Sequence, residues 1–121
     1  MIKAMLVDDE EWCLEELAQI LNATGLAEVT GEYSNPLEAL SAATSDAPDV
    51  IFMDVQMPGL TGLELAQKIR RAMPSVYLIL LSEKECFARN GFDIGVDDYL
   101  LKPLRRDRVL QALQRVARPG G

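Results

Sequence analysis

Polar side chains follow four of the apolar runs in this sequence, and their types define the chemistry that is available. These residues are Asp8 and Asp9, Asp54, Ser82 and Lys102. The chain has no histidine, which excludes the commonest general base near neutral pH and the Ser-His and Cys-His nucleophile pairs. Any reaction must therefore depend on carboxylates, hydroxyls and lysine.

The three aspartates predict a metal site if the fold brings them together. Carboxylates in one crevice repel each other and raise one another's pKa unless a cation is present. Ligation by oxygen alone suits Mg²⁺, which binds through one or two carboxylates and keeps waters that a phosphate oxygen can replace. Asp8, Asp9 and Asp54 are therefore candidate Mg²⁺ ligands.

Each of these residues also has an ordinary structural explanation. Asp8, Asp9 or Glu10 could cap a helix, because carboxylates are favoured at the positive N-terminal end of a helix. Asp54 could be a turn residue that leads to Pro58–Gly59. A serine or a lysine taken alone says little about function. The set is more informative than its members, because all of them follow apolar runs.

Five apolar runs have the character of strands and alternate with segments of helical periodicity. The expected strands are Ala4–Val7, Glu28–Tyr33, Val50–Met53, Val76–Leu81 and Tyr99–Leu101. Continuous hydrophobicity in the first, third and fourth indicates strands that are covered on both faces. The order (βα)5 with right-handed crossovers predicts an α/β fold, a doubly wound five-stranded parallel sheet in a three-layer α/β/α sandwich. In the flavodoxin-like strand order 2-1-3-4-5, the three aspartates would converge at the carboxyl ends of the first and third strands.

The signals for the helices differ in strength along the chain. The first helix has one apolar stripe, formed by Leu14, Leu17, Ala18 and Leu21. Asn35–Pro36 predicts a helix start, and Thr61–Glu64 reads as a capping box. The segment from about Lys84 to Ile94 contains Gly91, which costs about 1 kcal/mol relative to alanine in a helix interior. That helix is expected to be short or mobile, and a last helix is expected over residues 105–117.

Length and composition indicate one globular domain. The chain has 121 residues, of which 49% are hydrophobic and 26% charged. No apolar run approaches the roughly 18 residues that a membrane span needs, so we expect a cytoplasmic location and no membrane partner. The formal net charge of -7 would repel nucleic-acid phosphates. Cys13 and Cys86 lack CxxC spacing and are expected to be reduced thiols.

Three segments together resemble the signature regions of bacterial two-component response regulator receiver domains, the CheY-like superfamily. They are Leu6–Glu10, Asp54–Gly62 and Asp98–Pro103. The resemblance covers essentially the whole chain and implies a receiver domain over residues 1–118, followed by a linker or chain end at 119–121. It implies a phosphorylation-dependent signalling switch in a phosphorelay. Such a domain is not an enzyme, although it assists its own phosphoryl transfer and autodephosphorylation.

By this resemblance, Asp54 is the phosphoacceptor. Asp8 and Asp9 would hold Mg²⁺ together with Asp54, and the backbone carbonyl of Gln56 would complete the protein ligands. The phosphoryl group would come from the phosphohistidine of a sensor histidine kinase, which fits the absence of histidine here. Phosphoryl transfer depends mainly on positioning and on stabilising charge at the equatorial oxygens, so an ionised aspartate needs no histidine base.

The resemblance also implies roles for the residues that follow the last two strands. Lys102 would contact Asp54 first and the phosphoryl oxygens afterwards, and the Ser82 hydroxyl would bond the phosphoryl group. The peptide bond before Pro103 is expected to be cis, which would aim Lys102 into the crevice. Tyr99 matches the aromatic switch position, although packing on the last strand would also explain it. In the switch, Ser82 moves toward the phosphoryl group and Tyr99 turns into the space that it leaves.

The output is expected at the surface of the fourth helix, fifth strand and fifth helix, which could also form a homodimer. Transcription would be controlled through a C-terminal DNA-binding domain absent from this chain, and DNA would be contacted by that domain alone. The short stretch Ser82–Tyr99 resembles receivers attached to LytTR-type DNA-binding outputs. Glu83 departs from the small residue usual beside the switch hydroxyl and puts phosphoryl access or lifetime in doubt. Basic residues at 105, 106 and 108 form either a partner contact or a solvated helix face.

Three other functions fit the sequence less well. A pseudo-receiver interaction module would lack an acidic pair, the acceptor or the lysine, and all of these are present. A Mg²⁺-dependent phosphatase with an aspartyl nucleophile would carry a DxDx[TV] loop after the first strand and a longer chain with a cap. A flavodoxin would need a phosphate loop rich in Ser, Thr and Gly, whereas Asp8–Glu10 would repel the flavin phosphate.

Overall fold

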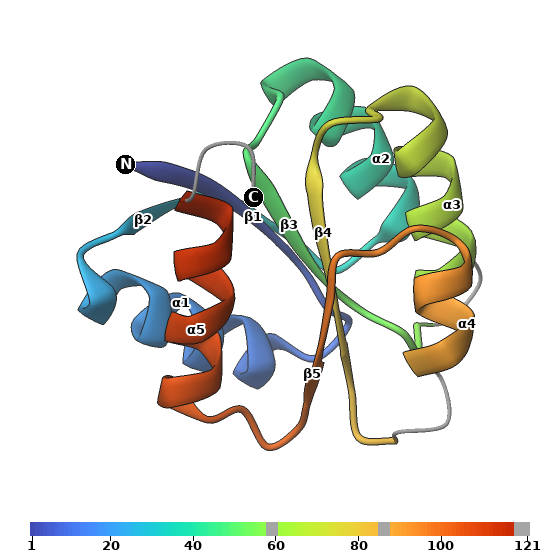
Figure 1. Ribbon diagram of the computed structural model, residues 1–121. Helices are drawn as coiled ribbons and strands as arrows, with labels where there is room; N and C mark the ends of the chain where they lie inside the picture. Colours follow the sequence, from blue (N-terminus) through green and yellow to red (C-terminus); the bar gives the residue numbers. More distant parts are fainter. Residues whose placement is uncertain (58–60, 85–87, 118–121) are drawn as a thin grey trace.

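The computed structural model describes residues 1–57, 61–84 and 88–117 and contains one five-stranded sheet (Figure 1). The strands are β1 (Ile2–Val7), β2 (Ala27–Tyr33), β3 (Val50–Asp54), β4 (Tyr77–Ser82) and β5 (Asp98–Leu101). The helices are α1 (Glu11–Thr24), α2 (Pro36–Asp46), α3 (Gly62–Ala72), α4 (Ala88–Asp93) and α5 (Arg106–Ala117). No helix in these ranges is long and apolar enough to cross a membrane.

The sheet has the strand order β2-β1-β3-β4-β5, and every pairing between neighbours is parallel. The expected fold is confirmed, and no strand end differs from the expected one by more than two residues. The apolar runs predicted this sheet because a strand buried on both faces has no polar alternation.

Alternate side chains of the central strands enter two separate cores. Ala4 and Leu6 of β1 belong to a core with α1 and α5, whereas Met5 and Val7 belong to a core with α2 and α3. Figure 1 shows the matching layers, with α1 and α5 on one side of the sheet and α2, α3 and α4 on the other. The sheet is therefore held from both faces, which fixes the positions of its strand ends.

Two of the predicted helix starts are present with their side-chain caps. The Asn35 side chain accepts hydrogen bonds from the amides of Leu37 and Glu38, and Pro36 follows as the first helical residue. The Thr61 hydroxyl accepts from the Glu64 amide at 3.2 Å, while the Glu64 carboxylate accepts from the Thr61 amide at 3.4 Å. The capping box fixes the start of α3 next to the end of β3.

Helix α4 is short over the part of the chain that the structure describes, and Gly91 has a packing role in it. A Cβ atom at Gly91 would lie 2.7 Å from Leu80 Cδ1 and 3.1 Å from Val96 Cγ2. A side chain at this position would require the Leu80 and Val96 side chains to shift. Glycine lowers the helix propensity here, but its lack of a side chain allows α4 to pack closely against Leu80 and Val96. The start of this helix expected at Lys84 cannot be compared, because residues 85–87 lie outside the described ranges.

Replacement of the cap of α3 should destabilise the fold measurably. We expect Thr61→Ala to lower the free energy of unfolding by about 1 kcal/mol, because the Glu64 amide loses its acceptor. Thr44→Ala is the matched control, since Thr44 lies exposed inside α2 and its hydroxyl donates to the Ser41 carbonyl. Alanine there should change the stability by less than about 0.5 kcal/mol. Urea unfolding measures both, and equal losses in the two variants would contradict the cap.

Candidate functional site

The carboxyl ends of β1, β3, β4 and β5 meet at one edge of the sheet and carry the polar side chains singled out in the sequence. Asp8 directly follows β1, Asp54 closes β3 and Ser82 closes β4. Asp54 pairs in register with Leu81, so Ser82 lies one residue further along the neighbouring strand. Lys102 follows Leu101, the register partner of Ser82. Parallel pairing therefore gathers these residues although almost a hundred positions separate them.

Lys102 is the cation of this site and is almost completely enclosed. Its Nζ lies 2.8 Å from Asp8 Oδ2 and 3.5 Å from Asp54 Oδ1. The three side chains are 5%, 2% and 7% exposed, respectively. The expected contact of Lys102 with Asp54 is present, but the shorter contact is with Asp8. The expected cis peptide bond before Pro103 is also present.

The aspartates form one cluster of carboxylates. One oxygen from each of Asp8, Asp9 and Asp54 lies within 4.8 Å of the others. Burial raises the pKa of Asp54 to about 6, with a further increase from the charge of Asp8, partly offset by Lys102. Burial also raises the pKa of Asp9. Burial would lower the pKa of Lys102, but its hydrogen bond with Asp8 and the charges of Asp54 and Asp8 raise it instead.

This donor set fits a divalent cation. Three carboxylates face one ammonium, so a negative charge of about two remains for a divalent ion to balance. All the donors are carboxylate oxygens, which Mg²⁺ prefers.

A second group, Asp8, Glu10 and Cys13, also has its ligand atoms within 4.8 Å. Burial raises the pKa of the Cys13 thiol to about 11, which keeps the sulfur protonated at neutral pH and makes this group the poorer metal site.

The ordinary explanations of the acidic residues do not match their contacts. Glu10 occupies the cap position of α1 without a side-chain capping bond. Asp8 Oδ1 accepts from the Glu10 amide at 3.0 Å, while the other oxygen of Asp8 contacts Lys102. Asp54 is 5% exposed and closes a buried strand. Asp8 and Asp54 are therefore held inside the crevice and do not serve as a helix cap or a solvated turn.

Ser82 and Tyr99 both contact the residues that follow β4. The Ser82 side chain is buried, and its Oγ accepts from the Lys84 amide at 3.0 Å. The Tyr99 hydroxyl donates to the Lys84 carbonyl at 2.5 Å. Lys84 thus connects the predicted switch serine to the predicted switch tyrosine through its backbone. Gln56 and Glu83 are exposed beside the crevice.

The family is shown by comparison with known proteins. The family model described as "Response regulator receiver domain" matches residues 4–114. This chain is a response regulator receiver domain. It is 38% identical over 119 residues to an uncharacterized response regulatory protein of Vibrio cholerae, and the match covers 98% of this chain and 49% of that protein. It is 35% identical over 116 residues to the transcriptional regulatory protein BtsR of Salmonella typhi, covering 96% of this chain and 48% of BtsR.

The fold comparison agrees with the sequence comparison. The crystal structure of the response regulator domain of Thermotoga maritima CheB superimposes with a TM-score of 0.88 at 26% identity, covering 96% of each chain. Receiver domains of response regulators act in two-component signalling. The receiver spans about half the length of the curated relatives it matches.

Sequence reasoning missed two features of this receiver. The motif containing Asp98 predicts no contact for it, yet Asp98 is 5% exposed and its Oδ1 accepts a hydrogen bond from Arg108 at 3.1 Å. Arg108 therefore pairs with a buried carboxylate, whereas Arg105 pairs with the exposed carboxylate of Asp107. Gly62 was read only as part of a capping box. A Cβ atom on it would overlap the Asp54 carbonyl oxygen and lie 2.6 Å from Val55 Cα.

The pKa of Asp54 predicts a pH-dependent gain of stability when its charge is removed. Because the folded pKa of about 6 lies above the usual 3.8, the folded state binds more protons between these values, and stability falls as the pH rises through this window. Without Mg²⁺ at pH 8, Asp54→Asn should raise the free energy of unfolding by about 1 to 3 kcal/mol. This gain in the free energy of unfolding should be smaller at pH 4. Urea unfolding at pH 4 and pH 8 measures it.

The control for that experiment is Asp46→Asn, the same substitution at an exposed carboxylate on the last turn of α2. Its effect on the free energy of unfolding should be small and equal at the two pH values. An Asp54→Asn variant that is less stable than the wild type at pH 8 would contradict an unfavourable burial of the Asp54 charge beside Asp8.

The close approach of Gly62 to Asp54 predicts that its substitution disturbs the site. Gly62→Ala should lower the free energy of unfolding by about 1 to 3 kcal/mol, because the backbone of β3 or α3 must move. It should also weaken Mg²⁺ binding, read from the fluorescence of the one tryptophan, Trp12, whose indole donates to Glu10.

Gly25→Ala is the control for this prediction. Gly25 has a φ of +70° with no atom within 4 Å of a Cβ, so alanine there is strained without a clash. It should destabilise the receiver and leave Mg²⁺ binding unchanged. Equal Mg²⁺ affinities in the two variants would show that Gly62 has no part in placing Asp54.

Proposed function

We propose that this receiver is a phosphorylation-dependent switch whose phosphoacceptor is Asp54. The observation that carries the proposal is the enclosed contact of Lys102 with both Asp8 and Asp54, next to the carboxylate of Asp9. Three carboxylates lie close together with one enclosed ammonium among them. Such a group can accept a negatively charged phosphoryl group if a metal ion balances the added charge. The proposed donor is the phosphohistidine of a sensor histidine kinase.

Transfer begins when an ionised Asp54 oxygen attacks the phosphorus. The new P–O bond forms as the P–N bond to the donor imidazole breaks, and the electron pair of that bond returns to the imidazole nitrogen. Lys102 contacts the phosphoryl oxygens, and the Ser82 hydroxyl donates a hydrogen bond to one of them. Asp8, Asp9, Asp54 and the backbone carbonyl of Gln56 would hold Mg²⁺. When bound, the ion neutralises charge on the phosphoryl oxygens and on the carboxylates.

The phosphoryl group leaves by hydrolysis at the same site. Water attacks the phosphorus, the bond to Asp54 breaks, and the electron pair remains on the regenerated carboxylate. Glu83 is exposed beside Ser82 and brings a negative charge near the path of the incoming water and phosphoryl group. Its charge is expected to affect how long the phosphorylated state lasts.

The switch depends on breaking two contacts of Lys84. When Ser82 turns to the phosphoryl group, its Oγ no longer accepts from the Lys84 amide, and Tyr99 turns inward away from the Lys84 carbonyl. The affected surface, which we call the α4–β5–α5 surface, comprises Ala88–Asp93, Asp98–Leu101 and Arg106–Ala117. It contains Leu101, which is 41% exposed, and a cavity of about 370 Å³ beside Tyr99 and Leu101. We propose that a homodimer or another partner contacts this surface.

The output we propose is the control of transcription by a C-terminal DNA-binding domain in the cytoplasm. Two observations support it: the receiver spans about half the length of its relatives, and one of these is named a transcriptional regulatory protein. The net charge of -7 makes direct DNA binding by the receiver unfavourable. An output of the LytTR type is our proposal for that domain, on the basis of the short Ser82–Tyr99 stretch.

Incubation with Mg²⁺ and acetyl phosphate tests the phosphoacceptor. The wild-type receiver should gain one labile phosphoryl group by intact mass, and Asp54→Asn should show none above background. Asp46→Asn should be phosphorylated like the wild type. Beryllofluoride with Mg²⁺ should bind the wild type and change the fluorescence of Trp12.

Two outcomes would contradict the proposal. One is a phosphoryl adduct of unchanged amount in Asp54→Asn. The other is a wild-type receiver that neither gains the adduct nor binds beryllofluoride at millimolar Mg²⁺.

A further inference from the structure

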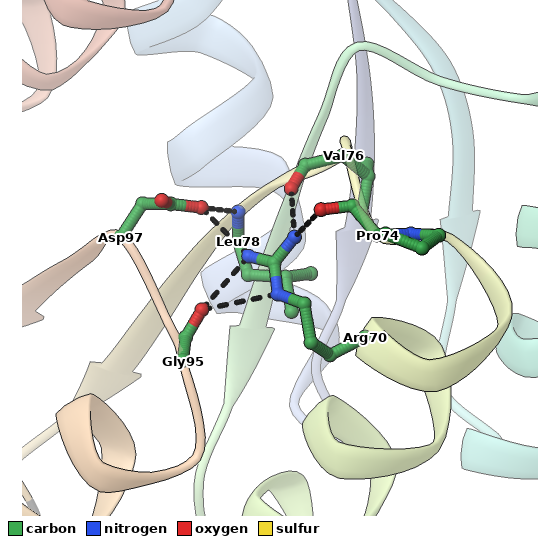
Figure 2. A network of polar contacts seen from close by, with 6 residues as sticks. All are labelled: Arg70, Pro74, Val76, Leu78, Gly95 and Asp97. Atoms are coloured by element: carbon green, nitrogen blue, oxygen red, sulfur yellow. Dashed lines mark hydrogen bonds and ion pairs between the residues drawn. The ribbon is translucent and has the colours of Figure 1, made fainter.

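Arg70, near the end of α3, contacts both the segment that leads into β4 and the turn between α4 and β5 (Figure 2). Both segments lie at the amino ends of their strands, whereas Asp54 lies at the carboxyl end of β3. Its Nε and Nη2 donate to the Gly95 carbonyl at 3.1 and 2.9 Å. Its Nη1 donates to the carbonyls of Pro74 at 2.9 Å and Val76 at 2.6 Å. Its Nη2 also donates to Asp97 Oδ2 at 2.8 Å. A guanidinium has five N–H donors, and these five contacts use all of them.

Asp97 extends this network into the sheet. Its Oδ2 also accepts from the Leu78 amide at 2.9 Å, and its own amide donates to the Leu78 carbonyl at 2.8 Å. The turn between α4 and β5 is therefore bound to the beginning of β4 and to the end of α3. We call this group of Arg70, Gly95, Asp97 and Leu78 the Arg70 clamp.

The clamp also fixes the C-terminal end of α4. The Gly95 amide donates to the Phe92 carbonyl and the Val96 amide donates to the Gly91 carbonyl, each at 3.1 Å. Gly95 has a φ of +94°, a conformation that glycine adopts without strain. Gly95 therefore closes the turn through its amide, while its carbonyl receives two hydrogen bonds from Arg70.

The connection that precedes α4 has neutral contacts in its described part, residues 83 and 84. There the backbone of Lys84 is bonded to the hydroxyls of Ser82 and Tyr99. These two bonds join neutral groups, whereas Arg70 makes five bonds from one charged guanidinium, and charge-assisted hydrogen bonds are the stronger kind. The end next to Asp54 should therefore rearrange more readily than the end held by Arg70.

We propose that Arg70 is a positioning residue that makes the C-terminal end of α4 a fixed pivot for the switch. This inference rests on the proposed function and adds a regulatory role to a residue far from the phosphoacceptor. When phosphorylation releases the contacts of Lys84, the pivot keeps the α4–β5 turn in place. The rearrangement that begins at Lys84 then changes the α4–β5–α5 surface, because the α4–β5 turn does not move with it.

The test uses Arg70→Lys, which keeps the positive charge and loses the planar fork with five donors. Arg71→Lys is the matched control, because Arg71 is the exposed neighbour on the same helix. Backbone amides are followed by NMR in the full chain, with and without beryllofluoride and Mg²⁺. In the wild type, beryllofluoride should shift the amides of Lys84 and Leu101 and leave those of Gly95 and Val96 nearly unchanged.

In Arg70→Lys, the amides of Gly95 and Val96 should exchange with solvent at least about tenfold faster. The shifts caused by beryllofluoride should now spread to both amides and shrink at Leu101. Arg71→Lys should behave like the wild type. Asp97→Asn keeps an acceptor for the Leu78 amide and should give a smaller change in the same direction, which preserves the test if Arg70→Lys does not fold.

The outcomes separate this inference from the proposed function. Equal shifts at Gly95 and Lys84 in the wild type would overturn the pivot alone. Faster exchange in Arg70→Lys with an unchanged beryllofluoride response would make Arg70 a purely stabilising residue and would also overturn it. Absence of any shift at Asp54 and Val55 in the wild type would overturn the phosphoacceptor and the pivot together.

Discussion

The enclosed ion pair between Lys102 and Asp8 is the interaction on which the candidate site depends, because neither charge is stable there without the other. The side chains are 5% and 2% exposed, and removal of one partner from such a pair leaves a buried charge uncompensated. The partners come from the ends of β5 and β1, which are not neighbours in the sheet. Their contact therefore requires that the intervening β3 and β4 hold their order and register. Buried ion pairs contribute little net stability, so the two apolar cores must supply it.

The parallel sheet explains why so much of the site could be predicted from the sequence. Strands buried on both faces appear as continuous apolar runs, and parallel pairing brings their carboxyl ends to one edge. The gathering of Asp8, Asp9 and Asp54 follows from these two facts. Lys102 was a weaker inference, since a lysine after a strand is usually a solvated residue, and the motif resemblance was needed to place it. Its preference for Asp8 over Asp54 depends on side-chain geometry that spacing does not encode.

Local sequence rules do not predict the roles of Gly62 and Gly91. Helix propensity counts Gly91 as a defect and a capping box treats Gly62 as a neutral position. In the fold, a Cβ atom at Gly62 would meet the backbone of Asp54 and Val55, and one at Gly91 would meet the side chains of Leu80 and Val96. The contacts that decide their roles, with Leu80 and Asp54, come from other elements of the chain. The same limit applies to Arg70, whose partners in the α4–β5 turn lie about 25 residues away.

The carboxyl ends and the amino ends of the strands differ in how well their charged groups are balanced. At the carboxyl edge, burial and then the charge of Asp8 raise the pKa of Asp54 to about 6, and three carboxylates face one ammonium. Added charge, from a metal or a phosphoryl group, changes the energy of that edge strongly. At the amino edge, the donors of Arg70 are all satisfied by carbonyls and one carboxylate, which leaves little for a ligand to change. A switch needs one part that responds to charge and one that stays in place, and β4 and α4 extend from the first edge to the second.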